Sequence, residues 1–302
     1  MDGISVVISV YSVNRADDVV DCIESLKQQT LLPKEVIVVL DPDEALVAYY
    51  KKRLGSTVRL LVSDAFGLSC ARNMGIKNSN SKIIAFIDDD AVADRDWLKN
   101  LIRNFADSSV IGVGGRIIPV WPKDNPRWFP EELYWVVGCS YKGLPTKKAA
   151  IRNPIGCNMA FRRSVFEKVG SFSTSVGRIG NKLLGHDDTE FGIRATRKLV
   201  GTKIVYDPEA VVYHRVSVNR VSLKYVLKRS YAEGFSKAFV SHSQRNNKSA
   251  LNTEKDYVRT LFLSTPTFLF QSNLRTGASR CVTLWIATIM VFLGYIVGSR
   301  PS

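Results

Sequence analysis

The chain has 302 residues, a mass of 33.7 kDa, and 42 lysines and arginines against 28 acidic residues, which gives a formal net charge of +14. Hydrophobic residues make up 45% and charged residues 23%, ordinary values for a globular protein that exclude a disordered or collagen-like chain. The five cysteines are scattered singly, without a CxxC pair. This argues against a disulfide scaffold and a structural zinc site, and it favours a reducing compartment.

The chain begins with a short apolar, β-branched segment. Residues 3–11 lack the basic flank of a secretory signal and are typical of a strand. We therefore expect the main body of the protein to stay in the cytoplasm.

Helices and strands alternate over the following residues. Helical spacing predicts a helix over residues 16–29, and the later segments are predicted as a strand at 35–40, a helix at 45–54, a strand at 58–62, a helix at 68–78 and a buried strand at 83–87. This alternation predicts an α/β fold with a parallel sheet flanked by helices. Such sheets bind ligands at the carboxyl ends of their strands.

Aspartates follow these predicted strands. Asp41 and Asp43 follow one strand, Asp64 follows the next, and residues 88–90 form an Asp-Asp-Asp run after the third. Adjacent carboxylates repel one another and favour a divalent cation, and oxygen ligands favour Mg²⁺ or Mn²⁺ over zinc. An alternative remains open, in which Asp90 begins a helix that runs through Leu98.

A second acidic group, GHDDTE, occupies residues 185–190 and precedes a helical pattern. Acidic residues are favoured at helix N-termini as caps and by the helix dipole. Capping and catalysis are therefore both open for this group.

The C-terminal part is basic and then apolar. Residues 215–280 carry 12 lysines and arginines against 3 acidic residues, and residues 281–298 carry no charge. At about 1.5 Å per residue the uncharged segment is about 27 Å long, which makes it a candidate transmembrane helix. A second apolar run at 261–270 contains Pro266 and suits an interfacial or re-entrant segment, although two buried core helices remain an alternative.

A basic segment beside an apolar one indicates contact with anionic lipids on the cytoplasmic side of a membrane. Nucleic-acid binding is the competing use of such a segment. The sequence has no recognised nucleic-acid motif and no aromatic residues interleaved with these charges, so no nucleic-acid partner is expected.

Six motifs in this order resemble glycosyltransferase family 2. They are SVVISVYS, SLKQQTLLPKEVIVVLD, GLSCARNMGI, KIIAFIDDDA, GCNMAFRRSVFEKVGSF and GHDDTEFGIR, and the resemblance covers residues 3–216. It implies the GT-A fold, in which a Rossmann-like, mostly parallel sheet is flanked by helices. It also implies an inverting transfer from a nucleotide-sugar donor, with a general base on the acceptor side and a metal-bound diphosphate as leaving group.

The resemblance implies roles for individual residues in the nucleotide pocket. Asp41 would bind the uracil or ribose of the nucleotide, with Ser9 and Tyr11 close by. Asp64 and Arg72 would complete the nucleotide and pyrophosphate pocket.

The resemblance also implies a metal site. Asp88 and Asp90 match the family's DxD motif, with Asp90 coordinating Mg²⁺ or Mn²⁺ and Asp88 or Asp89 contacting the ribose and the metal. His214 is similar to a late histidine that completes metal binding in many GT-A enzymes, and a purely structural role for it stays open.

The second acidic group supplies the candidate base. A sugar hydroxyl is a poor nucleophile until a positioned carboxylate takes its proton. The family often has Glu-Asp where this chain has Asp187 and Asp188, so Asp188 is the candidate base and Asp187 a donor or acceptor contact. Asn158 matches a family loop and could contact a sugar hydroxyl, with a turn residue as the alternative.

Aromatic residues gather in the segment 119–135, between the DxD motif and the candidate base. Their rings, Trp128 among them, could contact sugars or the membrane interface, or could simply pack. We expect acceptor choice to depend on this segment. The processive QxxRW signature is absent, which favours the addition of one sugar per encounter.

Together these patterns predict a membrane-associated enzyme with its catalytic domain at residues 1–216 on the cytoplasmic side. A basic juxtamembrane helical region at 217–259 and an apolar membrane-associated segment at 260–302 would follow it. The expected partners are a UDP-sugar, a polyprenyl- or dolichyl-phosphate-linked acceptor and membrane lipids, as in similar prokaryotic enzymes of surface-glycan or protein-linked glycan assembly. UDP-glucose is the first candidate donor, and a hexuronic acid donor such as UDP-glucuronate is the alternative.

Two other classes of protein are alternatives to a glycosyltransferase. A metal-dependent nucleotidyltransferase would show a glycine-rich phosphate loop after the first strand, and none is present. A non-catalytic membrane-bound binding module is disfavoured by the presence of Asp88, Asp90 and Asp188 together.

Overall fold

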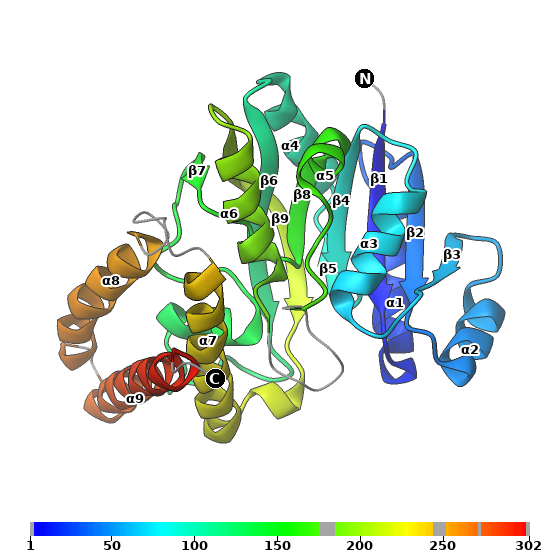
Figure 1. The fold of residues 1–302 in the computed structure, drawn as a ribbon. Coiled ribbons are helices and arrows are strands. Elements are labelled where there is room, and N and C mark those ends of the chain that lie inside the picture. The colour runs from blue at the N-terminus through cyan, green and yellow to red at the C-terminus, as the bar shows by residue number, and fades with distance from the viewer. Residues whose placement is uncertain (1–2, 176–184, 244–251, 271–272, 300–302) are drawn as a thin grey trace. The chain divides into compact units, whose positions relative to one another are not determined.

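A mixed β-sheet runs through the first of two units into which the chain divides (Figure 1). The computed structural model describes residues 3–175, 185–243, 252–270 and 273–299. The first unit comprises Met1–Ile118, Pro145–Lys182 and Asp187–His214, and the second comprises Pro119–Leu144, Leu183–His186 and Arg215–Ser302.

The described strands and helices are as follows. The strands are β1 (Ile4–Val10), β2 (Glu35–Leu40), β3 (Arg59–Val62), β4 (Ile83–Asp88), β5 (Ala91–Ala93), β6 (Val110–Val120), β7 (Ala149–Ile151), β8 (Asn158–Arg162) and β9 (Lys203–Arg215). The α-helices are α1 (Ala16–Lys27), α2 (Glu44–Leu54), α3 (Leu68–Asn78), α4 (Trp97–Ile102), α5 (Arg163–Val169), α6 (Asp187–Lys198), α7 (Leu223–Ser243), α8 (Asn252–Leu269) and α9 (Leu274–Gly298). Short 3-10 helices are η1 (Val13–Arg15), η2 (Arg103–Ala106), η3 (Glu131–Val137) and η4 (Val218–Arg220).

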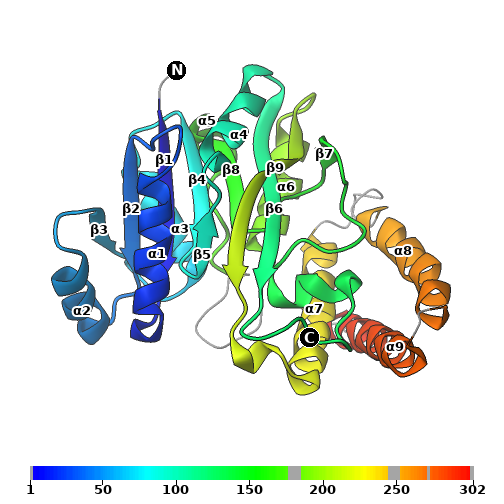
Figure 2. The same cartoon turned by 180° about the vertical axis from the view of Figure 1, so that it is seen from behind.

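The sheet has a parallel half and an antiparallel half. Its strand order is β3-β2-β1-β4-β8-β6-β9-β5, and β7 pairs with β9. Strands β3, β2, β1 and β4 are parallel to one another, whereas β8 pairs antiparallel with both β4 and β6. Helices α1 and α3 cover opposite faces of the parallel half (Figures 1 and 2). The predicted α/β fold is confirmed, and the antiparallel pairs complete it.

One segment differs from its sequence-based expectation. The alternative in which Asp90 begins a helix through Leu98 is wrong, because Ala91–Ala93 form strand β5 and pair with β9. Strand β9 itself is 13 residues long and continues through Pro208 to Arg215. Pairing with this distant strand decides the local conformation of residues 91–93.

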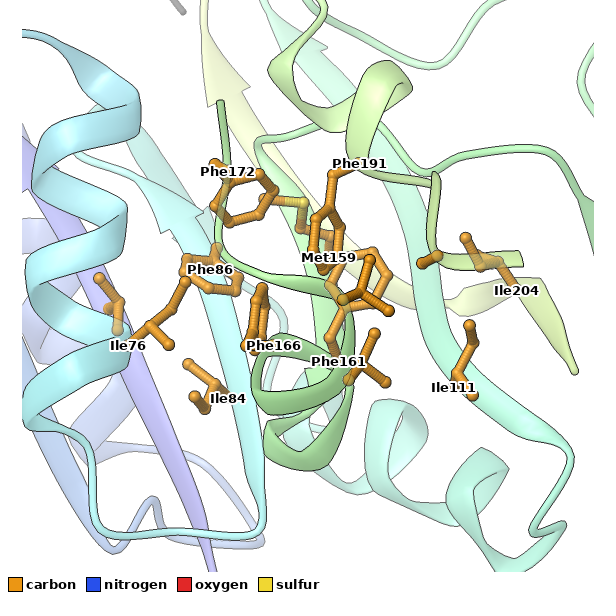
Figure 3. Close-up of a cluster of buried hydrophobic side chains, with 14 of the residues drawn as sticks. Ile76, Ile84, Phe86, Ile111, Met159, Phe161, Phe166, Phe172, Phe191 and Ile204 are labelled. Atoms are coloured by element: carbon orange, nitrogen blue, oxygen red, sulfur yellow. The ribbon is translucent and has the colours of Figure 1, made fainter. Parts of the chain in front are cut away.

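Five phenylalanines form the centre of a core between the sheet and helices α3, α5 and α6 (Figure 3). Phe161 and Phe191 meet edge to face with ring centroids 5.0 Å apart, and Phe166 stacks on Phe191 at 4.9 Å. Phe86 and Phe172 complete the group. Gly112 is required beside it, because an added Cβ would lie 2.3 Å from the Phe161 ring. This packing holds α6, and therefore its N-terminus, against the sheet.

Helices dominate the second unit. Helix α9 crosses α7 at close range, since a Cβ at Gly234 would lie 1.8 Å from the carbonyl oxygen of Val291, and one at Gly294 would lie 2.0 Å from that of Tyr231. Among the described residues, α9 is the one helix long and apolar enough to cross a membrane by length and composition. The division into a catalytic domain and two C-terminal regions at 217–259 and 260–302 stays a prediction.

Candidate active site

Polar side chains lie where the parallel strands end, at one edge of the sheet of the first unit. Ser9 on β1 is in register with Asp88, the last residue of β4. Asp41 follows β2 directly, and Asp64 follows β3 two residues after its end. Because β2 and β4 pair with opposite edges of β1, Asp41 and Asp88 lie on either side of that strand.

Asp41 is held by the loop that precedes α3. Its carboxylate accepts a hydrogen bond of 3.2 Å from the backbone N–H of Gly67, whose φ of +119° is rarely adopted by residues with side chains. Burial raises the pKa of Asp41 above its ordinary value, and the Gly67 hydrogen bond opposes that rise. The carboxylate is therefore positioned at the edge of the sheet by a loop that only glycine readily forms.

Arg72 on α3 connects the two acidic motifs. Its side chain is buried, its Nη1 lies 2.8 Å from Asp187 Oδ2, and its Nη2 lies 3.6 Å from Asp88 Oδ1. Nη2 also donates a hydrogen bond of 3.0 Å to the backbone carbonyl of Gly156. Although burial opposes it, Asp187 and Asp88 together raise the pKa of Arg72. One buried guanidinium thus holds the end of β4 and the start of α6 together.

Asp187 and Asp188 begin α6 but have different surroundings. Asp187 is 4% exposed and is engaged by Arg72 and by the hydroxyl of Ser69, which donates to its Oδ2 at 3.2 Å. Asp188 is half-buried, and its carboxylate accepts from the backbone N–H of Gly156 at 2.9 Å and of Thr189 at 2.6 Å. Asp187 is paired with a buried cation, and Asp188 is the more accessible of the two carboxylates.

Asp89 and Asp90 are buried around Arg15. The Nη1 of Arg15 lies 2.6 Å from Asp89 Oδ1 and 2.9 Å from Asp90 Oδ2. Burial raises the pKa of Asp89 to about 7 even though Arg15 opposes the rise. Asp89 is 2% exposed, so the structure places it beneath the site and does not support the predicted contact with ribose or metal.

His214 on β9 lies beside the strand-end aspartates. It is 2% exposed, it pairs with Ala91 in the β5–β9 ladder, and its Nε2 lies 3.2 Å from Asp90 Oδ1. Asp88, His214 and Cys157 each offer a ligand atom, and these atoms lie within 4.8 Å of one another. One carboxylate, one imidazole and one thiol can together hold a divalent cation, the carboxylate suiting Mg²⁺ or Mn²⁺ and the imidazole and thiol favouring softer ions.

Asn158 at the start of β8 is completely buried. Its Oδ1 accepts from Trp97 Nε1 at 2.8 Å, and its Nδ2 donates to the carbonyls of Arg116 at 3.0 Å and Ala210 at 2.8 Å. Both amide hydrogens are therefore used within the sheet. This geometry does not support the predicted contact of Asn158 with a sugar hydroxyl.

Three predicted residues lie elsewhere. Asp64 lines an open cleft of about 560 Å³ whose lining includes Arg163 and Glu167 but not Asp88. Tyr11 is 44% exposed, with the guanidinium carbon of Arg15 4.9 Å from its ring centroid. Trp128 belongs to the second unit, where its ring packs on that of Phe129 with centroids 5.3 Å apart.

Sequence reasoning missed Arg15 and Cys157. Arg15 ends the short 3-10 helix after β1, and a single arginine in such a segment carries no distinguishing pattern. Cys157 lies inside the GCNMA motif, next to Asn158. Because the cysteines are scattered singly along the sequence, nothing indicated that Cys157 and His214 would share a candidate metal site. In both cases the partner is distant in sequence.

The chain is similar to several known proteins. The family model described as Glycosyl transferase family 2 matches residues 5–170. A Haloferax volcanii protein named glucosyl-dolichyl phosphate glucuronosyltransferase is 28% identical over 300 residues, covering 98% of this chain and 96% of that protein. The succinoglycan biosynthesis protein ExoM of Rhizobium meliloti is 31% identical over 171 residues, covering 55% of this chain and 50% of that protein.

One solved structure is similar over most of the chain. It is the mannosyltransferase PcManGT from Pyrobaculum calidifontis, solved in complex with GDP-Man and Mn²⁺. The TM-score is 0.58 at 17% sequence identity, and the match covers 96% of this chain and 87% of that chain. At this identity the similarity shows the shared fold.

Proposed function

Because the chain belongs to glycosyltransferase family 2, we propose that it is an inverting enzyme that transfers a hexuronic acid from a UDP-sugar to a lipid-linked acceptor at a membrane. In the reaction, a hydroxyl oxygen of the acceptor attacks the anomeric carbon of the donor sugar. The bond from that carbon to the diphosphate breaks, and the hydroxyl proton passes to a carboxylate of the enzyme.

The contacts of Arg72 carry this proposal. Arg72 lies 3.6 Å from Asp88 and 2.8 Å from Asp187, so it connects the strand-end acidic motif to the acidic motif that begins α6. The first motif would face the donor diphosphate and the second the acceptor hydroxyl. A transfer reaction needs these two functions side by side.

Asp188 is the proposed general base. Asp187 beside it is paired with a buried cation, whereas Asp188 is half-buried and is held by backbone N–H groups of Gly156 and Thr189. These hydrogen bonds come from uncharged donors, so they orient the carboxylate and do not neutralise its charge. Asp188 thus stays the proposed general base, as expected from the sequence.

Asp88 and His214, with Cys157 beside them, are the residues that would hold a divalent cation. Asp90 Oδ1 lies 3.2 Å from His214 Nε2. Asp90, predicted from the sequence as a ligand, would thus orient the histidine. When bound there, Mg²⁺ or Mn²⁺ would neutralise the charge that develops on the leaving diphosphate.

The donor and acceptor are inferred from the relative that matches nearly the full length. The printed name of that Haloferax protein describes transfer of glucuronic acid to glucosyl-dolichyl phosphate. We infer a similar reaction class for this chain, with UDP-glucuronate ahead of UDP-glucose as donor and a polyprenyl- or dolichyl-phosphate-linked sugar as acceptor. The apolar helix α9 supports membrane association, and the basic residues before it favour the cytoplasmic side.

Calorimetry of the purified full chain tests the donor. We would titrate UDP, GDP, CDP and ATP with and without Mn²⁺ or Mg²⁺. Metal-dependent binding of UDP alone is expected, and binding of another nucleotide would replace the proposed donor. If none of them binds to folded protein, the assignment as an active transferase is overturned.

The transfer step is tested with Asp188→Asn, which keeps the shape of the side chain but cannot accept the proton. We expect the rate of transfer of radiolabelled glucuronic acid to the lipid acceptor to fall by about 10²- to 10⁴-fold, with UDP affinity nearly unchanged. Asp187→Asn is the matched variant. Unlike Asp188→Asn, it should weaken the ion pair between position 187 and Arg72. If Asp188→Asn loses nucleotide binding instead, Asp188 is not the base.

A further inference from the structure

Both ends of the apolar helix α9 contact the rest of the second unit. Near its first turns, Arg280 Nε donates a hydrogen bond of 2.8 Å to the backbone carbonyl of Arg127, in the 119–144 segment. Near its last turns, Gly294 packs against the backbone of Tyr231 on α7, and a Cβ at Gly298 would lie 2.9 Å from the carbonyl oxygen of Phe235 (Figure 1). These two anchors are about 27 Å apart along the helix axis.

The helix that holds the C-terminal end of α9, α7, carries several charged side chains. On α7, Arg229 Nη1 lies 2.9 Å and Lys237 Nζ 3.6 Å from the carboxylate of Glu233, and His186 Nε2 lies 3.3 Å from it. Lys237 also pairs with Glu254 of α8 at 3.2 Å. If α9 crossed a bilayer, α7 would have to lie at the far end of the span or within the hydrocarbon core. Moving its charged side chains through or into the hydrocarbon core costs free energy.

The opposite side of α9, together with α8, exposes a concentration of apolar side chains. Of the 25 large hydrophobic side chains that are exposed in the described part of the chain, 12 lie between Val258 and Val297. The most useful to the argument are Phe262, Leu263, Val282, Ile289, Phe292 and Ile296, which are 40 to 66% exposed. Exposure on this scale marks an interaction surface.

The charges next to this surface favour an anionic partner. In the sequence, residues 215–280 carry 12 basic and 3 acidic residues. Among the described side chains of α8 and α9, Arg259 and Arg275 are exposed, as is Asp256. An apolar face bordered by basic residues is complementary to a bilayer that contains anionic lipids.

We infer that α8 and α9 form a docking surface that lies in the plane of the membrane, with both ends of α9 on the same side of the bilayer. We call this surface, defined by the six apolar residues named above, the α8–α9 face. The inference rests on the proposed membrane association and adds that α9 does not span. It places the chain among proteins that lie on one leaflet, so a lipid-linked acceptor would be approached from that leaflet alone.

The first experiment measures binding of the full chain to vesicles of phosphatidylcholine and phosphatidylglycerol by co-sedimentation. Phe292→Glu should weaken binding at least about tenfold, because a large apolar side chain of the face becomes charged. The matched control is Val200→Glu, since Val200 is 90% exposed but belongs to the first unit, and it should bind like the wild type. Nucleotide binding by each variant confirms that it is folded. Equal binding of Phe292→Glu and wild type would overturn the α8–α9 face.

The second experiment reports topology. A protease-cleavable tag is appended after Ser302, and sealed vesicles that carry the protein with its catalytic unit outside are treated with protease. Cleavage of the tag without detergent is the expected result. A tag protected until detergent is added would show that α9 spans, overturning the in-plane inference but leaving the proposed function intact. If the wild type binds no vesicles at all, the proposed membrane association fails as well.

Discussion

Replacing Arg72 with methionine should destabilise the first unit strongly. The guanidinium is buried, lies 2.8 Å from Asp187 Oδ2, and donates to the carbonyl of Gly156. Methionine has a comparable length but no charge, so Asp187, itself 4% exposed, would remain as a buried carboxylate, with the Ser69 hydroxyl at 3.2 Å as its side-chain partner within the described residues. Removing one partner of such a buried pair costs about 3–5 kcal/mol.

Hydrogen exchange of peptides from β1 and β4 measures this cost, because it reports the opening free energy of the first unit without requiring the whole chain to unfold as one. A loss of about 3–5 kcal/mol lowers protection by about two to four orders of magnitude.

An exposed ion pair supplies the control for this experiment. Arg53 lies 2.8 Å from Asp17, the same distance as in the buried pair, but both side chains are well exposed, so Arg53→Met should cost about 1 kcal/mol or less. The double variant Arg72→Met with Asp187→Asn should cost less than the sum of the two single changes. Strictly additive costs, or a loss for Arg72→Met no larger than that for Arg53→Met, would refute the account of Arg72 as the connection between the two motifs.

Three further outcomes are expected. Asp89→Asn should flatten the pH dependence of stability measured by thermal melting. The pKa of Asp89 is raised to about 7, so its contribution to the stability of the folded chain is fully present below about pH 4 and is lost as the pH rises through 7. An unchanged profile would contradict the burial of Asp89 as a protonated acid. Cys157→Ser should weaken the binding of Cd²⁺, measured by calorimetry, at least about tenfold and leave the affinity for Mg²⁺ nearly unchanged, because sulfur prefers soft ions. Equal losses for both ions would show that the thiol is not a ligand. Gly234→Val should separate α7 from α9, since its Cβ would lie 1.8 Å from the Val291 carbonyl, and limited proteolysis should then cut the second unit faster than in the wild type.

Local sequence pattern determined most of the elements in the first unit. The helix expected at 68–78 is α3, and the strand expected at 35–40 is β2, because the spacing of apolar residues already states which face of each element will be buried. The sequence also predicted the aspartates at the strand ends, since parallel strands connected by helices end at the same edge of their sheet.

Pairing between distant segments decided what the pattern could not show. Residues 91–93 form a strand only because β9 offers a partner, with Ala91 opposite His214. The same long-range packing buried Asp89 against Arg15 and occupied both amide hydrogens of Asn158. A side chain's chemistry depends on its neighbours in space, and for these residues every decisive neighbour lies more than 40 positions away.

The apolar C-terminal helix shows the same division. Its composition determined that residues 281–298 would avoid water, and its length allowed a membrane span. Only the tertiary structure showed that Arg280 at one end and Gly298 at the other are both held by the second unit. Hydrophobicity is a property of a segment alone, whereas its orientation at a membrane follows from what each of its ends is bound to.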